Sequence, residues 1–295
     1  MTGTYRRWLV GIAGALLAVL VALFALAYRE ADRESRLSVV HAARAGTVRH
    51  LLGPSDFPPG VIAGDFGVAN EDTVVLLVDG RLHVAETLGA AEPRMREIEV
   101  QGTQPRSFTL DAQGELLAVA NGYFGALDAE GRIGEAVPLP DAGMRLAPST
   151  RAGAAYLFGG AGQEWRLYRF LADGSLQIVM QSDQRIVAVA DVGEEIYVAT
   201  TRAILRIRPV EPELLFAVPD GWAMRSLAAG ADGQLFFATD AKVYALIGPD
   251  AISVVNDAGG SLRVHEDALY VLDPRRRLLF DLRPASTQLF RELMP

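Results

Sequence analysis

The feature that most constrains the fold is a short apolar motif that returns about every forty residues. Six segments align on one apolar position, and successive aligned positions lie 42, 39, 41, 39 and 34 residues apart. These positions are Val75, Leu117, Tyr156, Tyr197, Phe236 and Tyr270. Further apolar runs, separated by turns such as Asp173-Gly174, flank each segment, so that one repeat holds four short strands. Four strands in about forty residues are typical of one β-propeller blade.

The six repeats predict an all-β protein, a six-bladed β-propeller over residues 61–295. A β-sandwich also has short strands at regular intervals, but its strands do not recur as a four-strand unit. Closing the blades into a ring also removes exposed strand edges, which favours the propeller.

Two segments show a blade pattern found in known propellers. Ile196–Thr200 (IYVAT) and Leu269–Phe280 (LYVLDPRRRLLF) are similar to the pattern LYVAD…N-R-V…F. In this pattern the chain resembles the six-bladed propellers of the NHL, SMP-30/gluconolactonase and strictosidine-synthase-like group. The resemblance extends over the domain at the level of the blade, and it implies the fold more than an activity.

The lactonase branch of that group implies a divalent metal in the central channel, bound by Glu, Asn and Asp side chains. The Glu-Gly-Pro motif that typically opens such a domain is missing here, as is the Pro-Asn-Gly element of a middle blade. Asn121-Gly122 is the nearest match, and this pair is typical of a hairpin turn. Asp240 and Asp273 end or follow core strands, where a turn-capping role is expected.

The remaining chemistry-bearing residues form no recognisable motif. The four histidines, which have no ligand spacing, are His41, His50, His83 and His265. His83 and His265 fall in blades one and six, which adjoin in a closed ring, so a shared site between them is one alternative. No nucleophile elbow, phosphate-binding loop or zinc motif is present, and no His–Asp pair suits a quinone-cofactor propeller. We expect no catalytic residue, no metal and no cofactor.

Residues 8–28 are an apolar run without charge. As a helix these 21 residues would span about 31 Å, close to the hydrocarbon core of a bilayer. Arg6 and Arg7 precede the run, and Trp8 and Tyr28 lie at its ends, where interfacial aromatic residues belong. The length favours an uncleaved signal-anchor, and a signal peptide cleaved after residues 25–27 is the alternative.

The anchor predicts a single-pass protein of the inner (plasma) membrane. Residues 1–7 would form a cytoplasmic head, and the propeller would lie on the periplasmic or extracellular side. Residues 29–60 are predicted as a stalk, helical over 29–49, followed by a linker rich in Gly and Pro over 53–60.

Composition excludes several classes of protein. The chain has no cysteine, which excludes disulfides and thiolate metal sites. The net charge of −8 argues against a general nucleic-acid binder, which is normally basic.

One cluster of basic residues departs from this acidic balance. Five arginines recur at intervals of 39, 40, 40 and 38 residues, at nearly the same place in blades two to six: Arg106, Arg145, Arg185, Arg225 and Arg263. In blade one Gly64-Asp65 takes that place. This position starts the innermost strand, so the arginines are predicted to ring one mouth of the central channel.

Three interpretations of this arginine column remain open. The guanidinium groups pair with aspartates on the incoming loops, namely Asp141, Asp183, Asp220 and Asp257. Alternatively, some guanidinium groups stay free to bind an anion, or the alignment is chance in an arginine-rich chain. Trp222, three residues before Arg225, is either a buried rim plug or an exposed recognition residue.

Together these observations predict a membrane-anchored, extracytoplasmic propeller that acts as a binding or scaffold module. Its expected partners are the lipid bilayer, through the N-terminal helix, and a protein or an acidic small ligand, bound at the arginine column and Trp222. The alternative is a metal-dependent enzyme of the lactonase or ester-hydrolase kind.

Overall fold

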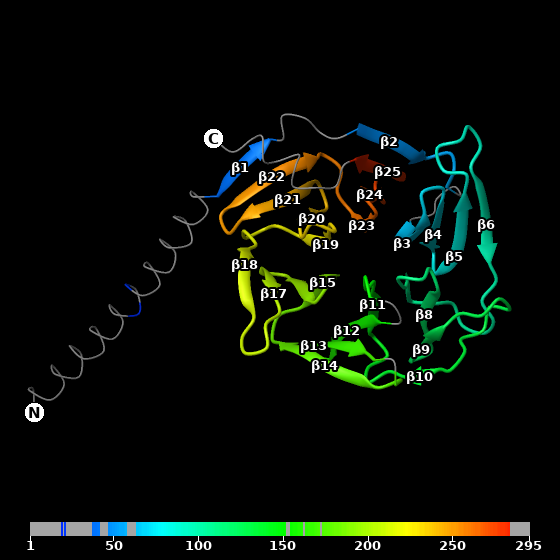
Figure 1. Ribbon diagram of the computed structural model, residues 1–295, viewed down its shortest axis with the longest axis horizontal. Helices are drawn as coiled ribbons and strands as arrows, with labels where there is room; N and C mark the ends of the chain where they lie inside the picture. Colours follow the sequence, from blue (N-terminus) through cyan, green and yellow to red (C-terminus); the bar gives the residue numbers. More distant parts are fainter. Residues whose placement is uncertain are drawn as a thin grey trace, which may run out of the picture. The chain divides into compact units, whose positions relative to one another are not determined.

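The computed structural model of the chain describes residues 37–41, 47–57, 63–151, 154–161, 163–171 and 173–283, with residues 19 and 21 in isolation. The chain separates into two compact units, Met1–Val39 and Val40–Pro295. In the second unit the described strands form six antiparallel sheets that surround a central axis (Figure 1). The predicted six-bladed propeller is confirmed.

Each blade consists of strands that follow one another from the axis outward. Blade one contains β3 (Ala63–Asn70), β4 (Thr73–Val78), β5 (Arg81–Glu86) and β6 (Arg94–Ile98). Blade two contains β7 (Ser107–Leu110), β8 (Leu116–Ala120), β9 (Tyr123–Ala126) and β10 (Val137–Pro138). Blade three contains β11 (Arg145–Ala147), β12 (Ala155–Ala161), β13 (Glu164–Phe170) and β14 (Leu176–Ser182).

The other three blades follow the same order, and two of them add an N-terminal strand. Blade four contains β15 (Ile186–Val192), β16 (Glu195–Thr200), β17 (Ala203–Arg206) and β18 (Glu213–Ala217). Blade five contains β19 (Met224–Ala229), β20 (Leu235–Thr239), β21 (Val243–Gly248) and β22 (Ala251–Asn256), with β1 (Ser38–His41) outermost. Blade six contains β23 (Ser261–His265), β24 (Ala268–Asp273) and β25 (Leu278–Arg283), with β2 (Thr47–Leu52) outermost.

The repeated apolar position lies on the second strand of every blade, where it packs between neighbouring sheets. Five of the six side chains are buried, and Leu117 on β8 is half-buried. Tyr270 on β24, for example, packs in a core cluster with Phe66 and Leu76 of blade one. The core therefore lies between the blades, and the repeat in the sequence is the repeat of that packing.

Local turn chemistry sets the hairpins. Asn121 and Gly122 have φ angles of 52° and 78° between β8 and β9, a left-handed pair suited to a two-residue hairpin. This agrees with the hairpin interpretation of Asn121-Gly122.

The ring is closed by the N-terminal side of the chain. The sequence predicts a helical stalk over 29–49, yet the described residues of that range, apart from Leu37, are extended, in β1 and the start of β2. β2 pairs with β25, and the Arg49 guanidinium donates to the buried Asp281 carboxylate at 2.9 Å. The linker predicted over 53–60 likewise contains a core residue, because Phe57 is buried.

The physical reason for this difference is strand pairing over a long sequence separation. β25 would be an open edge without β2, and an open edge leaves backbone N–H and C=O groups unpaired. Leu51 and Leu52 also gain burial in the cluster between blades six and one. Neither effect is visible in the local pattern of alternating charge.

The predicted membrane segment, residues 8–28, lies outside the described residues except for Val19 and Val21. Within the described part of the chain, no helix combines the length and the apolar character needed to cross a membrane.

Candidate functional site

The five arginines of the column occupy matching places on the inner ring of strands. Arg106 and Arg185 immediately precede β7 and β15, and Arg145 opens β11. Arg225 is the second residue of β19, and Arg263 is the third residue of β23. The first strand of each blade contacts the first strands of its neighbours, so these positions lie around the central channel.

Two of the five arginines are paired with carboxylates, and the partners differ from those expected. Arg225 forms a bidentate ion pair with Asp240, through Nε and through Nη2, and Nη2 lies 2.9 Å from the carboxylate. Arg263 donates from Nη2 to Asp65 at 2.7 Å. Asp240 thus forms an ion pair where a turn cap is predicted, and Asp65 is the residue that interrupts the column in blade one.

Two of the four aspartates predicted as partners make other contacts. Asp141 accepts the backbone N–H of Gly143, and Asp257 lies 3.4 Å from the Lys242 ammonium group. Pairing with the incoming-loop aspartates is therefore wrong for Arg225 and Arg263. The actual partners come from the β20–β21 turn of the same blade, for Arg225, or from the neighbouring blade, for Arg263, which sequence spacing cannot identify.

The other three arginines have no carboxylate partner among the described residues. The Arg145 guanidinium lies over the Phe158 ring, 5.9 Å from its centroid. Arg185 lies over the Trp165 ring at 5.7 Å. Arg106 donates to the backbone carbonyl of Ala142 at 3.1 Å. Contacts with aromatic faces hold a guanidinium in place without neutralising its charge.

A hollow at this end of the channel brings part of the column together. Its volume is about 580 Å³. We call it the arginine mouth, and the side chains of its lining used below are Arg145, Arg185, Trp222, Arg225, Asp240 and Arg275. Four arginines against one aspartate give these side chains a formal charge of +3. Arg263 lies deeper, in a narrower part of the channel that Arg145 and Arg225 also line.

Asp240 joins two cations of the arginine mouth. Besides Arg225, it contacts the Arg275 guanidinium at 3.2 Å. The hydrogen bonds from Arg225 lower the pKa of Asp240 below its usual range, so this carboxyl is ionised at neutral pH. All three side chains keep substantial exposure to solvent.

Trp222 is half-buried on the wall of the arginine mouth. Its ring stacks on Tyr244, with 4.8 Å between centroids, and Tyr244 in turn stacks on Phe237 at 5.1 Å. The stack fixes the indole in position while part of it still borders the hollow. The sequence allows either a buried rim plug or an exposed recognition residue at Trp222. The structure combines the two, because the indole is packed on one side and borders the hollow on the other.

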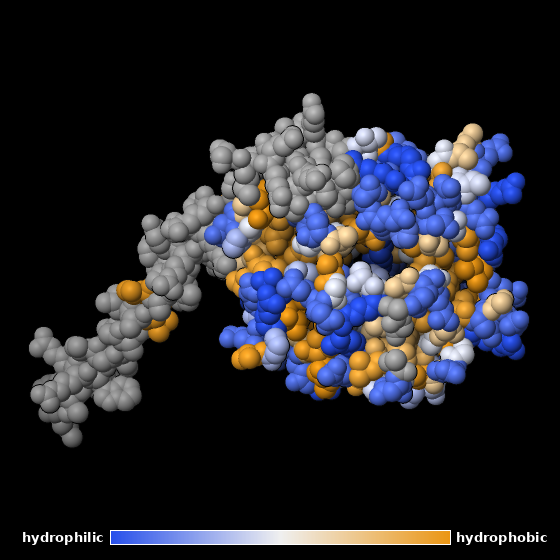
Figure 2. Space-filling model, in the orientation of Figure 1, coloured by the Kyte–Doolittle hydropathy of each residue, from blue (hydrophilic) through white to orange (hydrophobic). Residues whose placement is uncertain are grey.

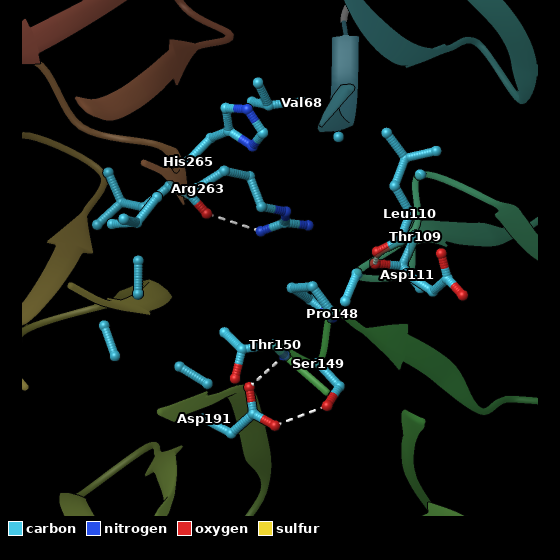
Figure 3. Close-up of a pocket in the computed structure, with 18 of the residues that line it drawn as sticks. Val68, Thr109, Leu110, Asp111, Pro148, Ser149, Thr150, Asp191, Arg263 and His265 are labelled. Carbon is cyan, nitrogen blue, oxygen red and sulfur yellow. Dashed lines mark hydrogen bonds between the residues drawn. The ribbon is translucent and has the colours of Figure 1, made fainter. Parts of the chain in front are cut away.

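The propeller face drawn in Figure 2 has a hollow near its centre, bordered by both hydrophilic and apolar residues. A second cavity, of about 370 Å³, is lined by residues from the inner strands of all six blades and the turns that follow them. Figure 3 shows Arg263 and His265 on one side of this cavity and Asp191 on another.

Asp191 is a buried acid that sequence reasoning missed. Its carboxylate accepts hydrogen bonds from the Ser149 hydroxyl at 2.7 Å and the Thr150 N–H at 2.7 Å (Figure 3). It also accepts one from the Tyr156 hydroxyl at 3.2 Å. Burial and the nearby Asp191 carboxylate raise the pKa of Tyr156. Because its partners lie more than thirty residues away, no local motif marks Asp191. These bonds join blades three and four.

The structure does not bring His83 and His265 together. His265 borders the second cavity from the inner strand β23, whereas His83 lies on β5, the third strand of blade one. Over the described ranges, no three His, Asp or Glu side chains are grouped closely enough to hold a metal ion. The channel acids Asp65 and Asp191 are already occupied by protein donors, so these residues do not suit a channel metal.

Comparison with known proteins gives a fold. No family profile and no curated protein sequence matches the chain. Among solved structures, a gluconolactonase from Xanthomonas campestris is 16% identical, with a TM-score of 0.57 over 83% of this chain and 97% of that one. The calcium-binding protein regucalcin from Agrobacterium tumefaciens is 14% identical, with a TM-score of 0.55 over 83% and 95%.

A third solved structure is virginiamycin B lyase from Staphylococcus aureus, which is 14% identical, with a TM-score of 0.52 over 80% of this chain and 99% of that one. Identities this low show a common fold, and a propeller fold carries many unrelated functions. This chain has the six-bladed propeller fold of the gluconolactonase and SMP-30 (regucalcin) type.

Proposed function

We propose that this protein is a membrane-tethered, extracytoplasmic binding module that recognises an acidic ligand or partner at the arginine mouth. The supporting observation is the imbalance of charge in the mouth, four arginines against one aspartate. Arg145 and Arg185 lie over aromatic rings, and neither forms an ion pair with a carboxylate among the described residues. Guanidinium groups with free N–H donors are suited to carboxylate and phosphate recognition.

Charge reversal at the two unpaired arginines tests this proposal. We expect the full-length double variant R145E/R185E, purified in mild detergent, to lose the acidic ligands or proteins that co-purify with the parent chain. The matched control is R94E, which reverses an exposed arginine on the outer strand β6. Equal recovery of bound material from the parent, R145E/R185E and R94E would contradict the proposal.

The tether is proposed from the apolar run over residues 8–28 and its flanking Arg6 and Arg7. A tether of this kind raises the local concentration of the propeller for partners in the same membrane. Alkaline extraction of membranes should leave the chain in the pellet, and protease added outside intact cells or spheroplasts should degrade the propeller. Release into the alkaline supernatant would argue against an anchor.

A lactonase or ester-hydrolase function is the second candidate. The likeness to solved structures described as a gluconolactonase and as regucalcin favours it, at the level of the fold. Elemental analysis of the purified protein decides between the two functions. A stoichiometric divalent metal, together with hydrolysis of a lactone that chelators abolish, would establish the enzyme.

A further inference from the structure

The arginine mouth has two halves that differ in how the guanidinium charge is balanced. In one half, Arg145 and Arg185 lie over aromatic rings and form no ion pair with a carboxylate among the described residues. In the other half, Arg225 and Arg275 share the single carboxylate of Asp240. The first half is open to an incoming anion, and the second half already holds an anion of the protein itself, the Asp240 carboxylate.

The Asp240 contacts are of the kind that an incoming anion can replace. The Asp240 side chain is 30% exposed, and those of Arg225 and Arg275 are 55% and 67% exposed. Water reaches all three side chains, so it screens their attraction in the folded protein and solvates the charges once they separate. Arg263 and Asp65, deeper in the channel, are only 15% and 12% exposed and are much harder to separate.

The size and charge of the mouth indicate the class of ligand. A hollow of about 580 Å³ lies within the range of small-molecule sites, about 300–1,000 Å³. The formal charge of +3 suits a ligand that carries two or more negative charges. The indole of Trp222, held by Tyr244, gives the wall a fixed flat surface beside these cations.

We infer that the arginine mouth takes a small dianion whose two acidic groups occupy the two halves. One group binds at Arg145 and Arg185, and the other displaces Asp240 from Arg225 and Arg275. Asp240 is then a specificity-determining residue, since only a ligand with a second acidic group compensates for its displacement. This inference rests on the proposed anion-binding function, and it adds the ligand class and the role of Asp240.

Calorimetric titration of the detergent-purified full chain tests the inference. The probes are inorganic pyrophosphate and glutarate, each with two acidic groups, and inorganic phosphate, with one. The variants are D240N, which removes the competing charge, and R145Q/R185Q, which removes the open half. D250N serves as the control, because it removes the same charge from the exposed β21–β22 turn of the same blade.

We expect the parent chain to bind a two-group probe at least tenfold more tightly than inorganic phosphate. D240N should bind that probe at least threefold more tightly than the parent, D250N should match the parent, and R145Q/R185Q should bind at least tenfold more weakly. Preference for pyrophosphate or for glutarate then assigns the ligand to phosphoryl or to carboxylate compounds.

The outcomes separate the inference from the proposed function. Binding that R145Q/R185Q abolishes but D240N leaves unchanged or weakens would overturn the role of Asp240 and leave anion binding in place. Equal affinity for one-group and two-group probes would overturn the dianion. Absence of binding to the parent, D240N and D250N alike would overturn both the inference and small-anion binding at the mouth. Thermal melting of each variant confirms that it is folded.

Discussion

The pair formed by Asp65 and Arg263 closes the inner ring between blades one and six, and its removal has a predictable effect. The Arg263 Nη2 donates to the Asp65 carboxylate at 2.7 Å, although 198 residues separate the two in the sequence. Their side chains are 12% and 15% exposed, and the Arg263 guanidinium also lies over the Phe66 ring at 5.6 Å. The substitution D65N would remove the negative charge with little change of volume.

The magnitude follows from the burial of the pair. At an effective dielectric constant of 20, two unit charges about 4 Å apart attract each other by about 4 kcal/mol. Removing one partner of a buried pair destabilises a protein by about 3–5 kcal/mol, because the other charge remains desolvated. Since both side chains keep slight exposure, we expect D65N to lower the free energy of unfolding by about 3 kcal/mol. For a domain of this size, that corresponds to a decrease in Tm of about 6–12 °C.

Urea unfolding and thermal melting of D65N, R263M and the double variant D65L/R263M provide the assay. Replacing both charges by apolar groups leaves no ion without its partner, so the double variant should recover to within about 1 kcal/mol of the parent. Two results would refute the reasoning: a loss below about 1 kcal/mol in D65N, or a loss in the double variant at least as large as that in D65N.

Two further predictions concern the closing strand and the pH dependence of blade four. L52A should lower the free energy of unfolding, measured with urea, by about 2–5 kcal/mol, because Leu52 is 1% exposed in the core. The control V48A, at a position 39% exposed on the same strand, should change that free energy by about 0.5 kcal/mol or less. An equal effect of both would place β2 outside the folded core. Hydrogen bonding from Tyr197, with the nearby Arg206, lowers the pKa of Glu195 below its ordinary value of 4.5 in the folded state. Ionised Glu195 therefore stabilises the fold above pH 4.5, and this contribution is lost as the pH falls through its folded-state pKa. In urea titrations, E195Q should lose less stability than the parent between pH 5 and pH 3. Equal losses in the two proteins would contradict this prediction.

The arginine column illustrates how far the candidate site follows from the sequence. The interval of about forty residues places Arg145, Arg185 and Arg225 at one position of successive blades, and the structure has them at the start of the inner strands. Spacing does not reveal the partners, because a guanidinium reaches side chains on other strands and other blades. Asp240 was expected to cap a turn and instead holds two arginines of the mouth.

By itself, the sequence determined the number of blades, the repeated apolar position on each second strand and the turn at Asn121-Gly122. These features depend on packing that recurs from one blade to the next, or on the backbone preference of one or two residues, and both leave a pattern along the chain. Only the tertiary structure decided that β2 completes blade six and that Arg263 pairs with Asp65. Both contacts form when the ring closes and residues about two hundred positions apart meet, and this proximity leaves no local pattern in the sequence.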